Sequence, residues 1–539
     1  MKSKYLWTPI LMAIAAIVGT LLGRISGNSS NAIQVMPQAV SLTGNNGSNK
    51  MQAILELIRS QYVDTVGIDT LVEDIIPKVI AKLDPHSVYI PAKDFERVNE
   101  DLKSDFGGIG IVFSITDDTV QVVSVVAGGP SSLLGVMPGD KIIKVDEEIF
   151  VGDSISNDLV MNRLRGQIGT QVSITVLREN QTIDYNITRD VIPIYSVEVA
   201  YTIEPGIGYM LIDRFAEKTY EEMLKGIAKL RADGCQTLIV DLRGNSGGLL
   251  DVVINMCNEF LSANDLIVYT EGVHHSREDA RANGIGTCQK MNVVVLIDEF
   301  SASASEIFAG AIQDNDRGTI IGRRSFGKGL VQTQMPLRDN SALRLTVARY
   351  HTPSGRCIQR PYDDGTAQYY DDLYKRYENG ELFEADSVKF DETQRFQTKG
   401  GRTVFGGGGI MPDIFVPRDT TKISDYLYKL RAKGIIYRFS IDYANQHRAE
   451  LSALSTPQLI EHLCSTDLLP SIKQYAISKG LSDKKLTPAE QKVINLEARA
   501  YIGRNIRDNE AFYPILNSDD PVIEKALSFL HQQAQDNQQ

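Results

Sequence analysis

The hydrophobic pattern of the first 24 residues differs from that of the rest of the chain. Lys2 and Lys4 precede a largely uncharged run from Tyr5 to Gly23. A helix of about 19 residues, rising about 1.5 Å per residue, comes close to spanning a hydrocarbon core of about 30 Å. The preceding charges favour a cytoplasmic N-terminus, and no clear A-x-A cleavage site follows. We therefore predict an uncleaved membrane anchor at residues 1–24, over the alternatives of a removed signal peptide or a buried helix.

Two regions of contrasting polarity follow the predicted anchor. Residues 25–49 are rich in Ser, Asn and Gly, which is typical of a flexible linker with a reach of about 28 Å. In residues 50–104 hydrophobic positions recur at helical spacing, as at Leu71, Ile75 and Val79, and this predicts an N-terminal helical region. The Asp84–Ser87 segment, D-P-H-S, interrupts the helical pattern with a proline.

Residues 105–190 change to short β-branched runs with turns between them. Gly-Gly-Pro and Pro-Gly-Asp sequences form the turns. This pattern predicts a small β-rich module. Its predicted strands are Ile109–Ile115, Val120–Val126, Lys141–Val145 and Val172–Leu177.

Strand and helix signals alternate in residues 191–420. Thr237–Asp241 and Val293–Asp298 are continuous apolar runs that end in Asp, as expected for parallel strands buried on both faces. A capping box, Thr219-x-x-Glu222, predicts the start of the helix that precedes them. Residues 361–404 are polar, acidic and rich in Tyr, and we predict a surface insertion that does not touch the site.

Helical signals return in residues 421–539. They include a second capping box, Thr487-x-x-Glu490, with a proline at the first helical position. The chain is therefore predicted to be a multidomain α/β protein. It has a parallel-sheet-containing core, a β-rich module, and helical N- and C-terminal regions.

Composition and charge narrow the classes of function. The chain has 539 residues, with 56 Lys and Arg against 68 Asp and Glu, and a net charge of −12. Such an acidic chain is a poor candidate for binding nucleic acid. Its five cysteines form no C-x-x-C pair, and its seven histidines form no H-E-x-x-H motif. We therefore predict no nucleic-acid partner, no zinc ribbon and no zinc-hydrolase site of the commonest type.

A turn of small residues follows the Val293–Asp298 run and contains Ser301, Ser303 and Ser305. A serine at a helix N-terminus is surrounded by free backbone N–H groups and by the positive end of the helix dipole. An oxyanion requires these surroundings. The alternative is that the serines only cap the helix. A Gly-rich turn, Asp241–Gly248, follows the first run, either as an ordinary connector or as a further oxyanion donor.

A serine hydroxyl is a weak nucleophile that needs a base, and no histidine here stands in a triad-like context. Lys328 lies among the apolar residues and glycines of Phe326–Leu330, a setting that lowers the pKa of a lysine. The Gly322–Gly329 loop also resembles a phosphate-binding Walker loop. It lacks the final Ser or Thr and leads into a β-like stretch, so we do not predict nucleotide binding.

Together these segments resemble the carboxy-terminal processing (tail-specific) proteases, a family of PDZ-containing serine–lysine peptidases. In that family the serine stands 25 residues before the lysine, and a Gln stands four residues after it. Ser303, Lys328 and Gln332 have these spacings. The resemblance covers residues 50–420, although the family's usual proline in the Gly-rich turn is Ser246 here. The other matching segments are Leu83–Ser87, Phe106–Ile111, Gly135–Asp140, Asp241–Gly248, Tyr350–Arg356 and Gly409–Asp413.

The resemblance implies a ClpP/crotonase-like protease core with an inserted PDZ domain. It also implies a mechanism through an acyl-enzyme intermediate, without a metal or cofactor. In this mechanism Ser303 attacks the scissile carbonyl, and neutral Lys328 takes its proton and passes it to the leaving amine. Gln332 is expected to hold the lysine amine in place.

The same resemblance implies an oxyanion hole made of backbone N–H groups. Ala304 would supply one donor, and Gly247 or Gly248 the other. Ser301 and Ser305 are expected to serve packing and capping instead of chemistry.

A PDZ domain binds a C-terminal carboxylate on backbone N–H groups and adds the peptide to a sheet edge. Arg165 is a candidate link through which this domain gates the protease, against the alternative of a surface arginine. Ile109 and Ile111 are expected beside an apolar side-chain pocket. The predicted carboxylate loop is Gly107, Gly108, Ile109 and Gly110.

The predicted function is a serine endopeptidase that cleaves extracytoplasmic proteins with apolar C-terminal tails. Its expected location is the periplasm or the periplasmic side of the bacterial inner membrane. The N- and C-terminal helices are candidate contacts for a homo-oligomer or an adaptor. A non-catalytic PDZ scaffold is the alternative from another class, and the co-occurrence of Ser303, Lys328 and Gln332 argues against it. Another alternative is a self-processing maturation enzyme, but the sequence shows no obvious cleavage site to support it.

Overall fold

The computed structural model describes residues 47–116, 118–126, 128–388, 391–419 and 424–536. The chain divides into two compact units, Met1–Ile75 and Ile76–Gln539. The predicted anchor and nearly all of the predicted linker lie outside the described residues. Among the described helices, none is both long enough and apolar enough to cross a membrane.

The predicted N-terminal helices are present as α2 (Gly47–Gln61), α3 (Ile68–Ile80) and α4 (Phe95–Lys103), the last preceded by the short helix η1 (Ala92–Asp94). One short strand, β1 (Val88–Ile90), lies among these helices, directly after the D-P-H-S segment. Val88, Tyr89 and Ile90 favour a strand, and β1 pairs antiparallel with β18 (Ala342–His351).

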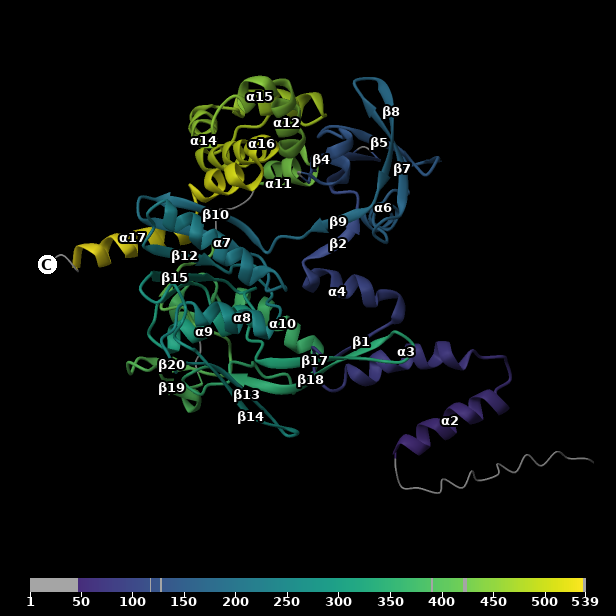
Figure 1. The fold of residues 1–539 in the computed structure, drawn as a ribbon, viewed down its shortest axis with the longest axis vertical. Helices are drawn as coiled ribbons and strands as arrows, with labels where there is room; N and C mark the ends of the chain where they lie inside the picture. The colour runs from purple at the N-terminus through teal and green to yellow at the C-terminus, as the bar shows by residue number, and fades with distance from the viewer. Residues whose placement is uncertain (1–46, 117, 127, 389–390, 420–423, 537–539) are drawn as a thin grey trace, which may run out of the picture. The chain divides into compact units, whose positions relative to one another are not determined.

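The core of the chain contains a mixed six-stranded sheet in the order β10-β11-β12-β15-β16-β21 (Figure 1). The prediction of parallel strands is confirmed, because the two apolar runs form β12 and β15 and these strands pair in parallel. The sheet is not parallel throughout, since β10 pairs antiparallel with β11. Its strands are β10 (Val197–Glu204), β11 (Ile207–Ile212), β12 (Thr237–Asp241), β15 (Asn292–Ile297), β16 (Thr319–Gly322) and β21 (Ile414–Phe415).

Three helices bury apolar faces in the core beside this sheet: α7 (Thr219–Ala232), α8 (Leu250–Asn258) and α9 (Ala304–Asp314). The predicted capping box at Thr219 is wrong. The N-cap of α7 is Lys218, and the Thr219 hydroxyl accepts a hydrogen bond from Ala216 N at 2.8 Å. The Glu222 carboxylate instead accepts from two backbone N–H groups of the chain entering β10.

A second sheet has the order β1-β18-β13-β14, with β17 (Leu330–Pro336) paired to β18. Its other strands are β13 (Leu266–Gly272) and β14 (His275–Arg281). The residues after Lys328 therefore continue as a strand and not as a helix. This agrees with the prediction that the Gly322–Gly329 loop is not a phosphate-binding loop.

The β-rich module forms a separate sheet in the order β3-β4-β5-β7-β8, with β3 at one edge. A two-stranded ribbon of β2 (Asp105–Gly108) and β9 (Asp190–Pro193) connects it to the core. The remaining elements are β3 (Ile111–Thr116), β4 (Thr119–Val125), α5 (Pro130–Leu134), β5 (Lys141–Val145), β6 (Glu148–Ile149), α6 (Asn157–Leu164), β7 (Gln171–Arg178) and β8 (Gln181–Thr188).

The segment 361–404 is not the surface insertion that we predicted. It forms α10 (Thr366–Glu378), η2 (Ala385–Ser387), η3 (Glu392–Gln394), β19 (Arg395–Gln397) and β20 (Thr403–Phe405). On α10, Tyr369 and Arg376 are each only 2% exposed. They lie seven residues apart and therefore share one buried helix face.

The C-terminal helices from α11 to α16 share a hydrophobic core of their own, whereas α17 buries its apolar face against the mixed sheet. The capping box predicted at Thr487 is confirmed, because Thr487 N donates to the Glu490 carboxylate and Glu490 N donates to the Thr487 hydroxyl. The helices are α11 (Asp425–Ala432), α12 (Ile435–Gln446), α13 (Arg448–Ser452), α14 (Thr456–Ser465), α15 (Leu469–Ser478), α16 (Pro488–Asn517) and α17 (Pro521–Asp536).

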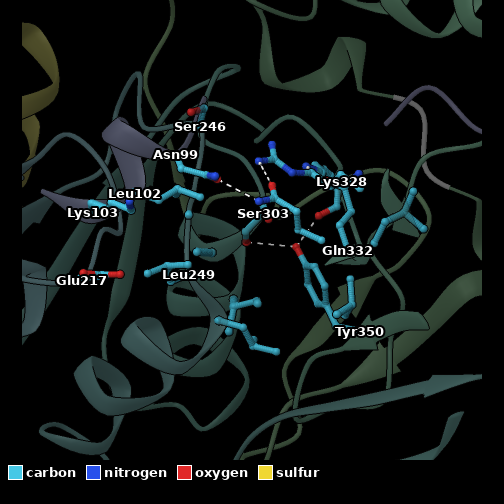
Figure 2. A pocket seen from close by; sticks show the side chains of 18 residues that line it. Asn99, Leu102, Lys103, Glu217, Ser246, Leu249, Ser303, Lys328, Gln332 and Tyr350 are labelled. Carbon is cyan, nitrogen blue, oxygen red and sulfur yellow. Dashed lines mark hydrogen bonds between the residues drawn. The ribbon is translucent and has the colours of Figure 1, made fainter. Parts of the chain in front are cut away.

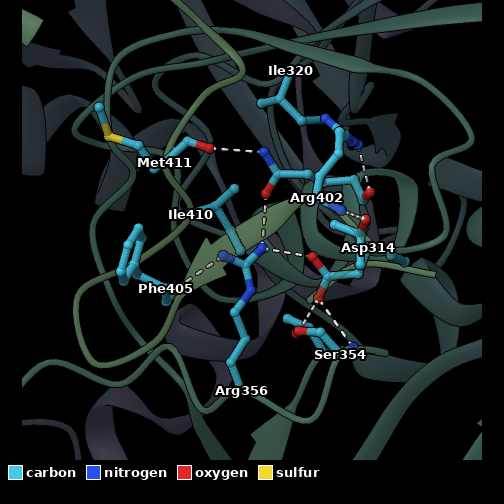
Figure 3. A network of polar contacts seen from close by, with 12 residues as sticks. Asp314, Ile320, Ser354, Arg356, Arg402, Phe405, Ile410 and Met411 are labelled. Carbon is cyan, nitrogen blue, oxygen red and sulfur yellow. Dashed lines mark hydrogen bonds and ion pairs between the residues drawn. The ribbon is translucent and has the colours of Figure 1, made fainter. Parts of the chain in front are cut away.

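A buried ion pair ties α9 to the segment after β18 (Figure 3). Arg356 donates to Asp314 at 2.7 Å, and the side chains are 1% and 0% exposed. Arg356 also donates to Gln313 Oε1 and to Phe405 O, while Asp314 accepts from the Ser354 hydroxyl. These bonds pair the two charges away from water and leave only Arg356 Nε without a hydrogen-bond partner in the group; such pairing is a condition for tolerating a buried ion pair.

We expect Arg356→Ala to destabilise the core by about 3–5 kcal/mol, because it leaves the Asp314 carboxylate buried without its partner. Urea unfolding followed by circular dichroism measures this loss. The control is Arg97→Ala, which removes an exposed partner of Asp94 and should cost about 0–1 kcal/mol. Equal losses in the two variants would contradict the prediction.

Candidate active site

Ser303 stands where the chain turns from β15 into α9. It is the N-cap of α9, with φ of 57° and ψ of −113°, a conformation that costs a non-glycine residue free energy. The neighbouring serines have structural partners, as predicted. The Ser301 hydroxyl donates to Leu242 O at 2.8 Å, and the Ser305 hydroxyl donates to Asn245 O at 2.9 Å.

Ser303 lines a cavity of about 470 Å³ together with Lys328 and Gln332 (Figure 2). The three residues come from the two sheets of the core, Ser303 from the β15–α9 turn and the others from the start of β17. The structure therefore brings together the serine, lysine and glutamine that the sequence singled out.

Lys328 is held by Gln332. Lys328 Nζ donates to Gln332 Oε1 at 3.0 Å, and Gln332 Nε2 donates to His86 O. Burial lowers the pKa of Lys328, and the nearby Arg344 guanidinium lowers it further against smaller opposite effects of carboxylates. Among the described contacts of Lys328 Nζ there is none to Ser303 Oγ. The contact that proton transfer from the serine to the lysine requires is therefore not formed in this structure.

The D-P-H-S segment supplies the backbone carbonyl that fixes Gln332. The Asp84 carboxylate accepts from His86 N at 2.8 Å, from Ser87 N at 2.7 Å and from the Ser87 hydroxyl at 2.6 Å. The Ser87 hydroxyl in turn accepts from Thr346 N on β18 at 3.0 Å. Sequence reasoning used this segment as a helix break and as a family motif and did not identify this positioning role.

Glu306 joins the serine turn to the lysine loop. Its carboxylate is fully buried and accepts from Ser303 N at 2.9 Å, Gly327 N at 2.7 Å and Lys328 N at 2.8 Å, as well as from the Ser325 hydroxyl. Burial raises its pKa, although these hydrogen bonds act in the opposite direction. The sequence alone did not lead us to single out Glu306. Its position three residues after an N-cap serine is a capping-box signal that could have found it.

Tyr350 makes a second connection between the same two segments. Its hydroxyl lies 3.1 Å from Ser303 O and also hydrogen-bonds Lys328 O (Figure 2). The ring is 1% exposed. A buried phenol with both partners in place fixes the backbone on either side of the cavity.

The predicted oxyanion donors lie beside Ser303, but Gly247 has another partner. Gly247 N donates to Asn245 Oδ1 at 2.8 Å. A Cβ at Gly247, whose φ is 103°, would lie 2.7 Å from the Ser303 Cβ, so only glycine fits this close approach. Gly248 and Ala304 both line the cavity, and the geometry favours Gly248 over Gly247 as the second donor.

The helix α10 packs on the lysine loop, contrary to the prediction that this segment does not touch the site. Arg376 donates to Ser325 O at 2.7 Å and to Phe326 O at 3.3 Å. The Arg360 guanidinium lies between two rings, 3.9 Å from the centroid of Phe326 and 4.0 Å from that of Tyr369. The polar composition of the segment concealed these buried contacts.

Tyr369 extends this packing to the D-P-H-S segment. Its hydroxyl is 2.9 Å from His86 Nε2. Burial and the positive charge of Lys328 lower the pKa of His86 to about 4. The imidazole is therefore neutral at neutral pH. It contacts Tyr369 and is not the base of a triad.

The predicted carboxylate loop lies at the start of the edge strand β3. Gly107 and Gly108 belong to β2, Ile109 is 2% exposed, and Gly110 has a φ of 75°. Ile111 packs against the hydrophobic core of the module together with Val160 and Leu164 of α6. The order β3-β4-β5-β7-β8 leaves one edge of β3 without a strand partner among the described residues.

Arg165 connects the β-rich module to α4. It forms an ion pair with Glu100 at 2.5 Å and lies 4.0 Å from the centroid of the Phe106 ring. Asn99 and Leu102, also on α4, line the cavity that contains Ser303. Arg165 therefore contacts the helix that forms one wall of the site.

No group of three or more His, Cys, Asp and Glu side chains within the described ranges is arranged as a metal site. The described residues thus offer no ligand set for a metal.

Three family models match separate parts of the chain. Peptidase family S41 matches residues 206–366, which contain Ser303, Lys328 and Gln332. The PDZ domain matches residues 107–188. A family of unknown function matches residues 426–508, within the C-terminal helices.

Curated relatives agree with the first two matches. The carboxy-terminal-processing protease of Bartonella bacilliformis is 37% identical over 343 residues, covering 61% of this chain and 77% of the relative. A "Probable CtpA-like serine protease" of Staphylococcus epidermidis is 31% identical over 361 residues, covering 66% and 73%. The solved photosystem II D1 C-terminal processing protease is 24% identical, covering 68% and 92%, with a TM-score of 0.35. The chain therefore belongs to the carboxy-terminal-processing serine proteases of peptidase family S41.

Proposed function

We propose that this protease cleaves with a Ser303–Lys328 dyad through an acyl-enzyme intermediate. Ser303 Oγ attacks the scissile carbonyl while Lys328 takes its proton and passes it to the leaving amine. Water then attacks the acyl-enzyme, with the lysine acting again as the base. The developing oxyanion is placed between Ala304 N and Gly248 N.

One observation carries this proposal: a buried lysine and a strained serine share one cavity, and the same carboxylate, Glu306, accepts from both backbone segments. The lysine hydrogen-bonds Gln332 in this structure, so the active arrangement requires Lys328 Nζ to approach Ser303 Oγ. Catalytic hydrogen bonds often shorten only when substrate binds. Closure of the site around substrate provides this movement.

We assign substrate recognition to the PDZ domain. An apolar C-terminal tail would pair with the free edge of β3, with its carboxylate at Gly107–Gly110 and its last side chain near Ile109 and Ile111. The contact between Arg165 and Glu100 offers a route by which tail binding moves α4 at the wall of the cavity.

The proposal also covers the location of the protease, its assembly with other chains and the fold type of its core. An anchor at residues 1–24 would place the protease at the periplasmic face of the inner membrane, where extracytoplasmic substrates are found. The N- and C-terminal helices would contact a second copy or an adaptor. The parallel strands from β11 to β21 support a ClpP/crotonase-like core.

We expect Ser303→Ala and Lys328→Ala each to reduce cleavage at least about 10³-fold, because members of a catalytic unit fail together. Cleavage of an unfolded protein ending in small apolar residues measures the loss. Ser305→Ala is the control and should stay within about tenfold of wild type. Unchanged cleavage by Ser303→Ala would exclude this nucleophile. Tail binding without any cleavage by wild type would favour the PDZ scaffold instead.

The pH profile should identify the base. Only the neutral lysine accepts a proton, so kcat/KM should rise with pH through a midpoint below the usual lysine pKa of 10.5. Gln332→Glu should move that midpoint upward, because an adjacent anion favours the ammonium form. A profile without any rise, or no shift in this variant, would argue against Lys328 as the base.

Glu306→Gln should lower kcat by about 10- to 100-fold, because an amide cannot accept hydrogen bonds on both of its former oxygen positions. The substitution removes acceptors from the serine turn and the lysine loop without touching substrate. Steady-state kinetics and a thermal melt separate positioning from unfolding. Glu222→Gln is the matched control, since Glu222 accepts from Ser196 N and Val197 N away from the cavity. An unaltered kcat in a folded Glu306→Gln variant would refute this role.

A further inference from the structure

Arg344 of β18 lines the active-site cavity with Ser303 and Lys328, yet the mechanism above does not use it. Its side chain is half-buried, and its described hydrogen bond is to the neutral Gln334 Oε1 at 2.8 Å. Among the described residues it has no carboxylate partner, whereas the buried guanidinium groups of Arg356 and Arg376 do. A partly buried charge without a counter-ion is costly unless something else supplies one.

We propose that Arg344 is an anion subsite that binds a carboxylate of the substrate beside the scissile bond. This inference rests on the proposed function, because it places the subsite in the cavity of Ser303. The planar guanidinium presents paired N–H donors that match a carboxylate. Burial lowers the pKa of Arg344, as expected for a guanidinium that has no carboxylate beside it.

The guanidinium is pre-positioned by Gln334, whose own amide is held by a further hydrogen bond. Gln334 accepts from Arg344 and donates through Nε2 to Asn99 Oδ1 on α4 at 2.9 Å. A side chain held in place before binding loses less conformational entropy when the ligand arrives. The contact to Asn99 also connects the subsite to the helix that Arg165 contacts through Glu100.

The charge of the cavity wall fits an anionic group. Its lining includes Lys103, Lys328 and Arg344, and Glu217 is its one acidic side chain among the described lining residues. With Lys328 neutral in the working enzyme, Lys103 and Arg344 still outnumber Glu217. The carboxylate has two sources in a protein substrate: an Asp or Glu side chain near the cleavage site, or the terminal carboxylate of a short tail.

Peptides that share one apolar tail and one cleavage site provide the test. One series carries Asp or Asn at each position that flanks the scissile bond, and a second series has a free or amidated C-terminus close to that bond. We expect wild type to prefer one carboxylate peptide over its neutral partner by about 10- to 100-fold in kcat/KM. The series in which this preference occurs identifies the source of the carboxylate.

Arg344→Gln should still cleave the neutral peptide, and its kcat/KM for the carboxylate peptide should be about equal to that for the neutral one. Arg344→Glu should prefer a peptide with Lys at the sensitive position, a reversal that a purely structural role would not produce. Arg349→Gln is the control, because Arg349 lies exposed on the same strand outside the cavity lining and should keep the wild-type ratio.

The inference is overturned if wild type cleaves charged and neutral peptides equally, a result that needs no folded variant. It is also overturned if Arg344→Gln keeps the wild-type ratio. Failure of the proposed dyad has a different signature, since Ser303→Ala would then still cleave. The two proposals can therefore fail separately.

Discussion

The buried carboxylate of Glu306 is the interaction on which the site depends. Ser303 follows a strand of the mixed sheet, while Lys328 precedes a strand of the antiparallel sheet. Neither sheet by itself determines how far apart these residues lie. Glu306 accepts hydrogen bonds from the backbone of both segments. A buried charge is tolerated only where donors surround it, so the energy of satisfying this carboxylate holds the two segments together.

Around this carboxylate, three further sets of contacts complete the positioning. Tyr350 contacts the carbonyls of Ser303 and Lys328, and α10 holds the carbonyls just before Lys328 through Arg376. The D-P-H-S segment is fixed to β18 and directs one carbonyl at Gln332. Segments that are far apart in the sequence thus fix the position of Lys328 and of the few atoms around it.

The sequence predicts those parts of the fold that depend on local patterns. Continuous apolar runs identified β12 and β15, and the small-residue turn placed Ser303 at the start of α9. Other features depend on tertiary partners that no local pattern contains. The Thr219 hydroxyl accepts from Ala216 N and does not cap α7. The polar residues of α10 are buried because Ser325 O and Phe326 O need donors. Gly247 N is occupied because Asn245 turns toward it. The family resemblance, and not a local pattern, placed Lys328 near Ser303 and Gln332 beside the lysine amine.

The hydrogen bond from Lys328 Nζ to Gln332 Oε1 has a consequence for the lone pair of the lysine amine. Gln332 Nε2 is directed at His86 O, so its Oε1 is the atom that faces Lys328 Nζ. An oxygen can only accept, and it therefore engages one N–H of the amine. A neutral lysine has a single lone pair, which this contact leaves unused. The glutamine thus leaves the lone pair of a neutral Lys328 available for the proton of the serine hydroxyl in the proposed dyad.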